Sequence, residues 1–307
     1  MALLSSGLVL TLTALVSLFL TPFDFPAARR LGAIDIPRDG RRMHTRPIPR
    51  LGGLSIFLAF LLFSLLFCFD IVPSLFYAWA GAILLVCVGV LDDALSLPPL
   101  LKLTAQLGAA YVSTIGGNLV NVLSVGGTRV SLGAFALPLT LLWTVTLINA
   151  HNFIDGLDGL CGGVSLAESA SLGLIGLVCG SPSYALAAFA VCGACLGFLP
   201  YNLDGARIFM GDSGSTFLGF ILAWLSVALF SSPTPPSPLS VILLFAVPLA
   251  DITVAIVRRV AKGKSPFLPD RSHIHHMLAD TKLGHFGASR LLRLVAALFA
   301  AISYFIS

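Results

Sequence analysis

The stretch PSLFYAWAGAILLVCVGVLDD, residues 73–93, decides the fold class of this chain. Residues 73–91 carry no charged side chain, and a helix of that length rises about 28 Å, close to the ~30 Å hydrocarbon core of a bilayer. Asp92 and Asp93 follow at once. Because a lone carboxylate is costly in hydrocarbon, this order predicts a transmembrane helix that ends with an acidic pair at the aqueous boundary.

The composition of the whole chain agrees with that stretch. Hydrophobic residues make up 57% and charged residues only 10%, against roughly 25% charged in a soluble domain. We therefore predict an all-α polytopic membrane protein with about ten transmembrane helices, organised as a single integral membrane domain over residues 1–307. The predicted spans are 3–21, 51–69, 73–91, 99–116, 134–150, 161–180, 184–200, 213–231, 239–257 and 290–306.

Lysine and arginine are distributed very unevenly between the two sides of these spans. The segment 22–50 carries seven and 258–293 carries eight, and Lys102 and Arg207 fall on the same side, so that only Arg129 lies opposite. The positive-inside rule then places the basic side in the cytoplasm and both termini on the other face. We read the excess charge as a topology signal and a contact with membrane lipids, and we expect no nucleic acid as a partner.

One segment outside the spans has a strand pattern. Residues 120–132 alternate apolar and polar side chains around Gly126-Gly127, which predicts a short β-hairpin on the extracytoplasmic face. The oligomeric state stays open, with a homodimer as one option.

Polar residues gather at the predicted cytoplasmic ends of the spans. Lys102 lies nine residues after Asp93 and can fold back over the acidic pair or contact a phosphate. The run NAHNFIDGLDG, residues 149–159, packs carboxamides and two acids among glycines that permit close backbone approach. A structural turn needs no acids three residues apart, so this composition favours a binding or catalytic loop.

Two further motifs point to an anionic substrate. Asp212 opens a long span, where an acid can serve as a helix cap, yet with a residue of the 149–158 loop it could also hold Mg²⁺, with Mn²⁺ as a substitute. The run DRSHIHH, residues 270–276, contains three histidines and an arginine. We favour phosphate contacts over zinc there, because no cysteine or further histidine cluster completes a tetrahedral shell.

These motifs resemble the polyprenyl-phosphate N-acetylhexosamine-1-phosphate transferases, a glycosyltransferase family 4 group that also includes the phospho-N-acetylmuramoyl-pentapeptide translocase. The histidine motif and Arg50 resemble the branch that uses UDP-N-acetylglucosamine and undecaprenyl phosphate. The matching segments occur in the family's order, at residues 49–53, 91–93, 149–160, 207–214 and 273–276.

The resemblance implies roles for individual residues. It implies Asp212 and Asn152 as Mg²⁺ ligands, and Asp92, Asp93 and Lys102 as the groups that handle the lipid phosphate, with Asp92 in the role of a base. The substrate-binding and remaining catalytic residues that it implies are Asn149, Gly156, Leu157, Asp158, Asn202, Phe209 and Arg271, and Asp155, His273, His275 and His276.

The activity expected from this resemblance is transfer of N-acetylhexosamine-1-phosphate from a UDP-sugar to polyprenyl phosphate, with release of UMP, at the cytoplasmic face of a bacterial inner membrane. Two alternatives remain: the muramoyl-pentapeptide reaction, and a secondary transporter of an anionic solute. Intramembrane acids such as Glu168 and Asp251 also occur in transporters, but transport sites lie near the midplane, whereas the clusters of this chain lie at one interface. We expect both of these acids to be paired inside the helix bundle.

Overall fold

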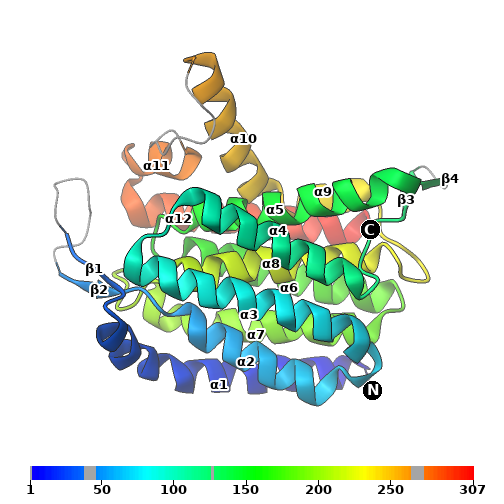
Figure 1. The fold of residues 1–307 in the computed structure, drawn as a ribbon, viewed down its shortest axis with the longest axis horizontal. Coiled ribbons are helices and arrows are strands. Elements are labelled where there is room, and N and C mark those ends of the chain that lie inside the picture. The colour runs from blue at the N-terminus through cyan, green and yellow to red at the C-terminus, as the bar shows by residue number, and fades with distance from the viewer. Residues whose placement is uncertain (1, 38–45, 126–127, 264–272) are drawn as a thin grey trace.

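The computed structural model describes residues 2–37, 46–125, 128–263 and 273–307, and these residues form a helical bundle (Figure 1). Two short antiparallel ribbons accompany it, β1 (Ile34–Asp35) with β2 (Ile48–Pro49) and β3 (Val122–Val125) with β4 (Thr128–Ser131). The helices are α1 (Ala2–Leu31), α2 (Gly53–Phe67), α3 (Val72–Leu95), α4 (Pro99–Ile115), α5 (Ala136–Ile154), α6 (Leu160–Val178), α7 (Pro182–Asn202), α8 (Gly211–Leu229), α9 (Pro238–Leu244), α10 (Ala246–Ala261), α11 (Ile274–Ala279) and α12 (Gly284–Phe305), with 3-10 turns at Phe69–Ile71 and Gly133–Phe135.

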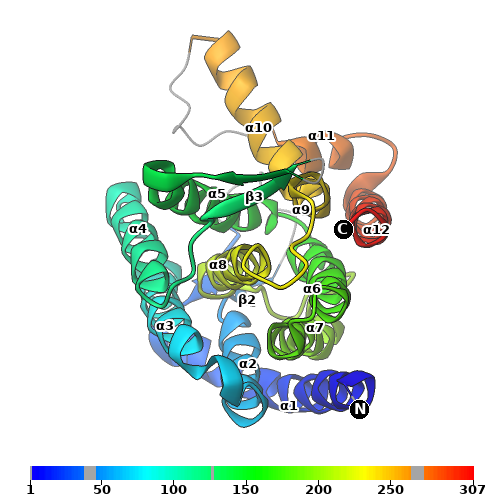
Figure 2. The ribbon, with the colours of Figure 1, turned by 90° about the vertical axis from the view of Figure 1, so that its right-hand side faces the viewer.

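Helix α8 forms the centre of the bundle. Figure 2 looks along it and shows α2, α3, α5, α6 and α7 around it. Its side chains are buried along almost its whole length, including Phe217, Phe220 and Trp224. A helix that is apolar on all sides is stable only when neighbours cover every face, and this burial accounts for the central position of α8.

Two glycines let α8 approach its neighbours backbone to backbone. A Cβ added at Gly53 of α2 would lie 2.2 Å from the Cα of Gly214, and one added at Gly89 of α3 would lie 2.5 Å from the Cα of Ser213. A larger residue at either position would push the helices apart. These contacts bring the start of α8 next to the end of α3, where the acidic pair lies.

The helices confirm the predicted membrane fold class. Among the described residues, seven helices are long and apolar enough to cross a bilayer, and the count rises to eight if α9 and α10 are one broken span. Helices α2 and α4 are shorter, with 15 and 17 residues. Each of the ten predicted spans coincides with helical structure, while the number of actual crossings stays a prediction.

The ninth predicted span, 239–257, is not one continuous helix. It breaks at Phe245, and α10 turns by 75° away from α9 and projects from the bundle (Figure 1). Pro248 explains the break, because proline has no N–H to donate and its ring clashes with the carbonyl four residues earlier, at Leu244. The apolar length of this segment predicts one span, and Pro248 is the feature that divides it.

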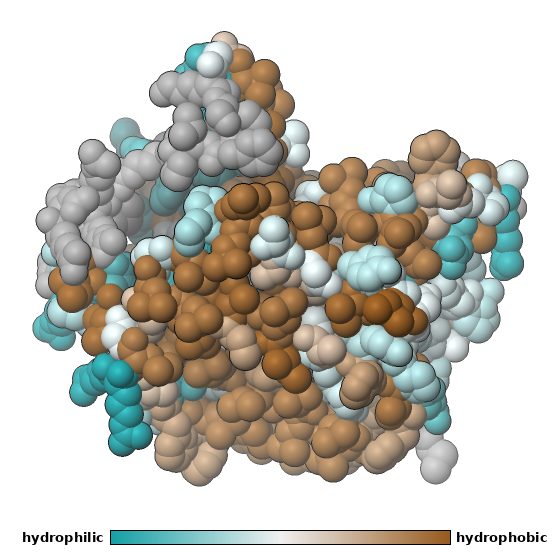
Figure 3. Space-filling view, in the orientation of Figure 1, coloured by the Kyte–Doolittle hydropathy of each residue, from teal (hydrophilic) through white to brown (hydrophobic). Residues whose placement is uncertain are grey.

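The two ends of the bundle differ. Both chain termini and the β3–β4 ribbon lie at one end, and β1–β2 lies at the opposite end (Figure 1). The β3–β4 ribbon, with Val122 opposite Ser131, is the predicted hairpin, although its tip at residues 126–127 lies outside the described residues. Between the ends, the face formed by α2, α3 and α4 is largely apolar (Figure 3), with Leu62, Phe76 and Ile83 exposed. Such a surface is suited to contact with lipid.

Candidate active site

A cluster of acids around one lysine forms where α3, α4 and α8 meet. Lys102 Nζ lies 3.0 Å from Asp92 Oδ2 and 3.1 Å from Asp212 Oδ2. Asp92 also accepts a hydrogen bond from the backbone N–H of Leu97 through Oδ1, at 2.7 Å. The predicted proximity of Lys102 to the acidic pair is therefore present, and Asp212 joins it from 110 residues further along the chain.

Asp93 faces a different neighbour from Asp92. Its carboxylate accepts the backbone N–H of Asp212 at 3.0 Å and that of Ser213 at 3.2 Å, so it satisfies two unpaired donors at the start of α8. The guanidinium of Arg50 lies 3.6 Å from Asp93 Oδ1. The side chain of Asp93 is buried, and both of its oxygens are committed to holding Asp212 and Ser213 in place. Its predicted catalytic role stays a prediction.

The two carboxamides predicted in the 149–159 loop lie on the last turns of α5. Asn149 exchanges hydrogen bonds with Gln106 of α4, at 2.7 and 3.4 Å. Asn152 donates to Ser215 Oγ at 3.0 Å, and its side chain also contacts the carboxylate of Asp212. Asn152 is thus adjacent to its predicted partner in a metal site, while Asn149 links α4 to α5.

Asp155 follows α5 and lies among several charged groups. Burial raises the pKa of its carboxyl well above the usual range, the Arg50 guanidinium opposes this rise, and the charges of Asp212 and Asp93 add to it. For Arg50, burial disfavours the charged form, but the surrounding carboxylates, with Asp93 the largest contributor, raise its pKa overall. Arg50 is therefore a fixed positive charge that balances this acidic region.

A pocket of about 930 Å³ adjoins the acidic cluster. Most of the residues predicted to bind the nucleotide sugar line it, and three arginines that were given no such role, Arg46, Arg50 and Arg207, line it too. Arg50 and Arg207 lie within the segments 49–53 and 207–214 that carry the family resemblance. An arginine in such a segment, next to a predicted phosphate site, was the sequence signal that could have identified both as pocket residues. The other lining residues are Phe25, Asp35, Pro47, Ile48, Asp155, Gly156, Leu157, Asp158, Asn202, Gly205, Ala206, Phe209, Gly211, His276, His285 and Phe286.

Asp158 and Asn202 organise the backbone of this pocket. Asp158 Oδ2 accepts the N–H groups of Gly205 and Ala206, at 3.0 and 2.9 Å. Asn202 accepts the N–H of Gly159 at 3.0 Å and donates to the carbonyl of Ile208 at 2.9 Å. Both side chains therefore hold the loop after α5 against the loop after α7, whether or not they also touch a substrate.

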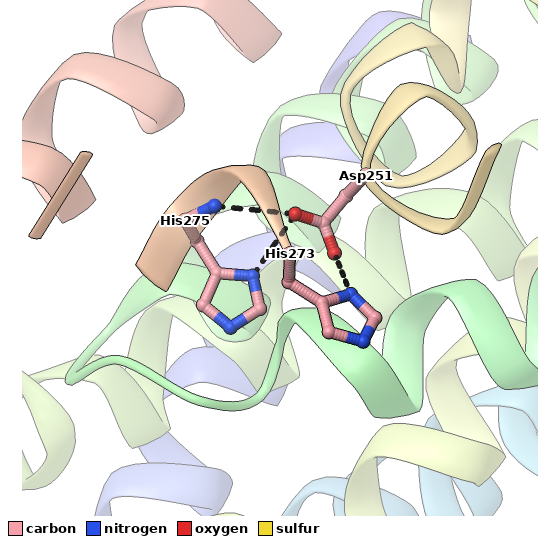
Figure 4. Close-up of side chains that lie close together, drawn as sticks. All are labelled: Asp251, His273 and His275. Atoms are coloured by element: carbon pink, nitrogen blue, oxygen red, sulfur yellow. Dashed lines mark hydrogen bonds and ion pairs between the residues drawn. The ribbon is translucent and has the colours of Figure 1, made fainter. Parts of the chain in front are cut away.

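The three histidines of the 273–276 motif have different surroundings, and Figure 4 shows two of them, His273 and His275, beside Asp251. His273 Nδ1 lies 2.7 Å from Asp251 Oδ2, and His275 Nδ1 lies 3.0 Å from Asp251 Oδ1. Both rings are buried, whereas the half-buried His276 lines the pocket. Arg271, which was predicted to bind substrate, lies outside the described residues.

The two acids expected to be paired are paired. Asp251 contacts His273 and His275, and Glu168 Oε2 lies 2.7 Å from His151 Nε2 in the interior of the bundle. His151 is thereby separated from the pocket, although it belongs to the 149–159 run. The sequence indicated that partners must exist but not which residues they are.

Among the residues that the structure describes, we consider two groups that could hold a metal ion. Asp92, Asp212 and Asn152 offer the oxygen donors that a hard cation prefers, and the ammonium of Lys102 shows that a positive charge fits between the two carboxylates. Asp251, His273 and His275 also bring three donor atoms within 4.8 Å of one another. In that second group, however, the single carboxylate is already balanced by Arg259, whose guanidinium nitrogen lies 3.1 Å from His273 Nε2, whereas the two carboxylates of the first group keep a net negative charge beside Lys102.

Comparison with known proteins identifies the family. The family model described as "Glycosyl transferase family 4" matches residues 75–230, which include the acidic cluster and much of the pocket. The chain belongs to glycosyl transferase family 4.

Members of this family with curated names align with nearly the whole chain. A Bacillus subtilis protein, "Probable undecaprenyl-phosphate N-acetylglucosaminyl 1-phosphate transferase", is 36% identical over 93% of this chain and 80% of its own length. An Escherichia coli K12 protein, "Undecaprenyl-phosphate alpha-N-acetylglucosaminyl 1-phosphate transferase", is 37% identical over 94% and 82%. A Mycobacterium tuberculosis H37Rv protein, "Decaprenyl-phosphate N-acetylglucosaminephosphotransferase", is 36% identical over 89% and 74%. The family resemblance read from the motifs is confirmed.

Proposed function

We propose that this protein transfers N-acetylglucosamine-1-phosphate from UDP-N-acetylglucosamine to a polyprenyl phosphate such as undecaprenyl phosphate. An acceptor phosphate oxygen attacks the phosphorus that bears the sugar, the bond from that phosphorus to the bridging oxygen breaks, and UMP leaves. The observation that carries this proposal is the junction of an arginine-lined pocket with a lysine held between two carboxylates. The family relatives named above support the same reaction.

The pocket has the size and charge that a nucleotide sugar requires. Its volume of about 930 Å³ falls within the roughly 300–1,000 Å³ of typical small-molecule sites. Arg50 and Arg207 offer cationic groups to a diphosphate, and Phe209 offers an aromatic ring to a base. Gly205, where an added Cβ would meet nothing within 4 Å, leaves room for the substrate to approach the backbone.

The lipid phosphate would be held beside Lys102. This lysine belongs to α4, whose outward side chains Leu101 and Leu107 are exposed on the apolar face, while its ammonium turns inward to Asp92 and Asp212. A polyprenyl chain could therefore stay in the lipid while its phosphate reaches the cluster. Positioning and charge neutralisation by these residues would supply most of the catalysis.

We also propose that the enzyme requires Mg²⁺, with Asp212 and Asn152 as ligands. Mg²⁺ commonly binds through one or two protein side chains together with substrate phosphates, and bound in this place it would neutralise phosphate charge. The ammonium of Lys102 neutralises part of the negative charge of Asp92 and Asp212. Asp93 keeps Asp212 in position through the backbone of α8.

The site is proposed to face the cytoplasm in a bacterial inner membrane. Arg46, Arg50 and Arg207 line the pocket, and Lys102 is beside it, whereas the β3–β4 ribbon with Arg129 lies at the other end of the bundle (Figure 1). The positive-inside rule orients the basic end to the cytoplasm, where UDP-sugars are made.

A UMP-release assay tests the reaction. Purified protein in detergent would be given undecaprenyl phosphate, Mg²⁺ and, in turn, UDP-N-acetylglucosamine, UDP-N-acetylgalactosamine or UDP-N-acetylmuramoyl-pentapeptide. We expect UMP and a lipid-linked product with the first donor. Arg129→Gln, at the opposite end of the molecule, is a matched control that should keep the wild-type rate. Absence of UMP with every donor would refute a transferase and favour a transporter, and release with the pentapeptide donor alone would assign the muramoyl reaction.

A further inference from the structure

Asp251 is the shared anchor of the histidine segment, and neither the motifs nor the reaction described above assigns it a part. Its carboxylate accepts both ring N–H groups described above and, in addition, the backbone N–H of His275 at 3.2 Å. All three bonds join α10 to the first residues around α11 (Figure 4). One buried carboxylate therefore fixes where this segment returns to the bundle.

The same face of α10 carries a second anchor. Asp251, Ala255 and Arg259 are all buried and are spaced four residues apart, which places them on one side of the helix. Arg259 donates to His273 Nε2, so that nitrogen is an acceptor and the ring proton of His273 must lie on Nδ1. Both nitrogens of His273 are thus used within the protein, and this ring is unavailable to a substrate.

His275 and His276 connect the Asp251 anchor to the pocket. The rings of His275 and His276 lie 4.2 Å apart between centroids, and His276 lines the pocket. His275 Nε2 is buried and has no hydrogen-bond partner among the described residues. It lies directly behind Gly156, where an added Cβ would come within 2.6 Å of it. The histidine segment and the Gly156 loop are therefore in close contact at the pocket wall.

We propose that Asp251 is a positioning residue for the donor substrate: it holds the His275 proton on Nδ1 and sets His276 and the Gly156 loop in the donor pocket. With its proton on Nδ1, His275 keeps Nε2 buried behind Gly156 and is not among the residues that line the pocket, so this ring affects the donor through His276 and the Gly156 loop and not by direct contact with a phosphate. This inference rests on the proposed function for the identity of the donor. It changes the expectation that all three histidines meet phosphates.

Steady-state kinetics of Asp251→Ala test the proposal. We expect KM for UDP-N-acetylglucosamine to rise about tenfold or more, as for the loss of a hydrogen-bonded anchor, while kcat changes less, because the hydrogen bonds described for Asp251 go to the histidine segment and not to Asp92, Lys102 or Asp212. Gly156→Ala, which leaves the buried carboxylate intact, should raise the same KM by pushing the loop away from His275. The matched control is Glu168→Gln, which alters the other buried histidine–carboxylate pair: it should lower the melting temperature and leave this KM within about twofold.

A spectroscopic readout separates this proposal from the proposed function. Selective ¹⁵N labelling of the six histidines, with His275→Gln to assign one of them, reports which ring nitrogen carries the proton. We expect the His275 proton on Nδ1 in the wild type and redistribution to Nε2 in Asp251→Ala. This test works even if no UMP is released, so a failed reaction would leave it decisive. A His275 signal that is unchanged in Asp251→Ala would overturn the proposal, and so would an unchanged KM in both variants or stoichiometric zinc on this cluster in the purified protein.

Discussion

Replacing Asp92 by asparagine would separate two roles that a carboxylate can have beside a phosphate. The family resemblance implies that Asp92 is a base that deprotonates the lipid phosphate. The structure shows instead that Oδ2 contacts Lys102 at 3.0 Å and Oδ1 accepts the N–H of Leu97. Asparagine keeps the size and the acceptor for Leu97, but it removes the charge that holds the ammonium.

The value of the base role can be calculated. A phosphate monoester has a second pKa of about 6, so about nine-tenths of it is already the dianion at pH 7. A surface potential of about −30 mV lowers the local pH by around half a unit, which leaves about three-quarters as the dianion. A base could therefore increase the reactive fraction by about 1.3-fold at most. Raising the pH should supply the same gain without any base.

The value of the positioning role is larger. A hydrogen bond to a charged group contributes about 1.5–3 kcal/mol, which corresponds to roughly 10- to 150-fold in rate. The side chain of Lys102 is 30% exposed, so solvent screening favours the lower part of that range. We expect Asp92→Asn to lower kcat/KM for undecaprenyl phosphate at least about tenfold. Raising the assay pH to about 9 should not restore the lost activity.

A double-mutant cycle makes this test sharper. If Asp92 acts through Lys102, then adding Asp92→Asn to Lys102→Met should cost much less than it costs in the wild type. UMP release would be measured for the four proteins across a pH series, with Arg129→Gln as the unaffected control. Recovery of Asp92→Asn to nearly the wild-type rate at high pH, or fully additive losses in the cycle, would refute the positioning argument.

Three further predictions concern orientation, metal and pH. In a background without reactive native cysteines, a cysteine at Lys262 should label from the cytoplasm and one at Thr128 from outside; labelling of both from the same face would refute the orientation. Asp212→Asn should abolish Mg²⁺-dependent UMP release without unfolding, and a wild-type rate at about millimolar Mg²⁺ would exclude Asp212 as the ligand. Because burial raises the pKa of Asp155, the folded protein binds that proton more tightly than the unfolded chain does, and metal-free stability should fall as the pH rises through the raised pKa. Asp155→Asn should therefore match the wild type in melting temperature below about pH 4, where aspartate is protonated in both the folded and the unfolded chain, and exceed it by a growing margin as the pH rises above that, whereas a constant difference would count against this cause.

The helices of this protein were predictable because apolar length is a local property. Each predicted span coincides with helical structure, and the hairpin at Val122–Val125 and Thr128–Ser131 lies where alternation placed it. The break in the ninth span was not predicted, although Pro248 was visible in the sequence. Hydropathy alone ranks an apolar segment as a span whether or not its backbone can continue as one helix.

The partners of the buried acids were not predictable in the same way. Asp251 and His275 are 24 residues apart, separated by a change of direction that no local pattern defines. Glu168 and His151 lie on different helices, and only packing brings them together. The cost of burying a lone charge indicates that a partner exists, but the three-dimensional fold decides which one it is.

The adjacent acids Asp92 and Asp93 have different contacts because of helix geometry. Successive side chains on a helix point about 100° apart, so two neighbours face different groups. Asp92 turns to Lys102, while Asp93 turns to the backbone of α8, with Arg50 beside it. Asp93 thus fixes the main chain of Asp212, while Lys102 links the side chains of Asp212 and Asp92. Because each acid secures a different part of the same cluster, replacing either one should disturb Asp212, and a shared loss of activity alone would not show that both acids touch the substrate.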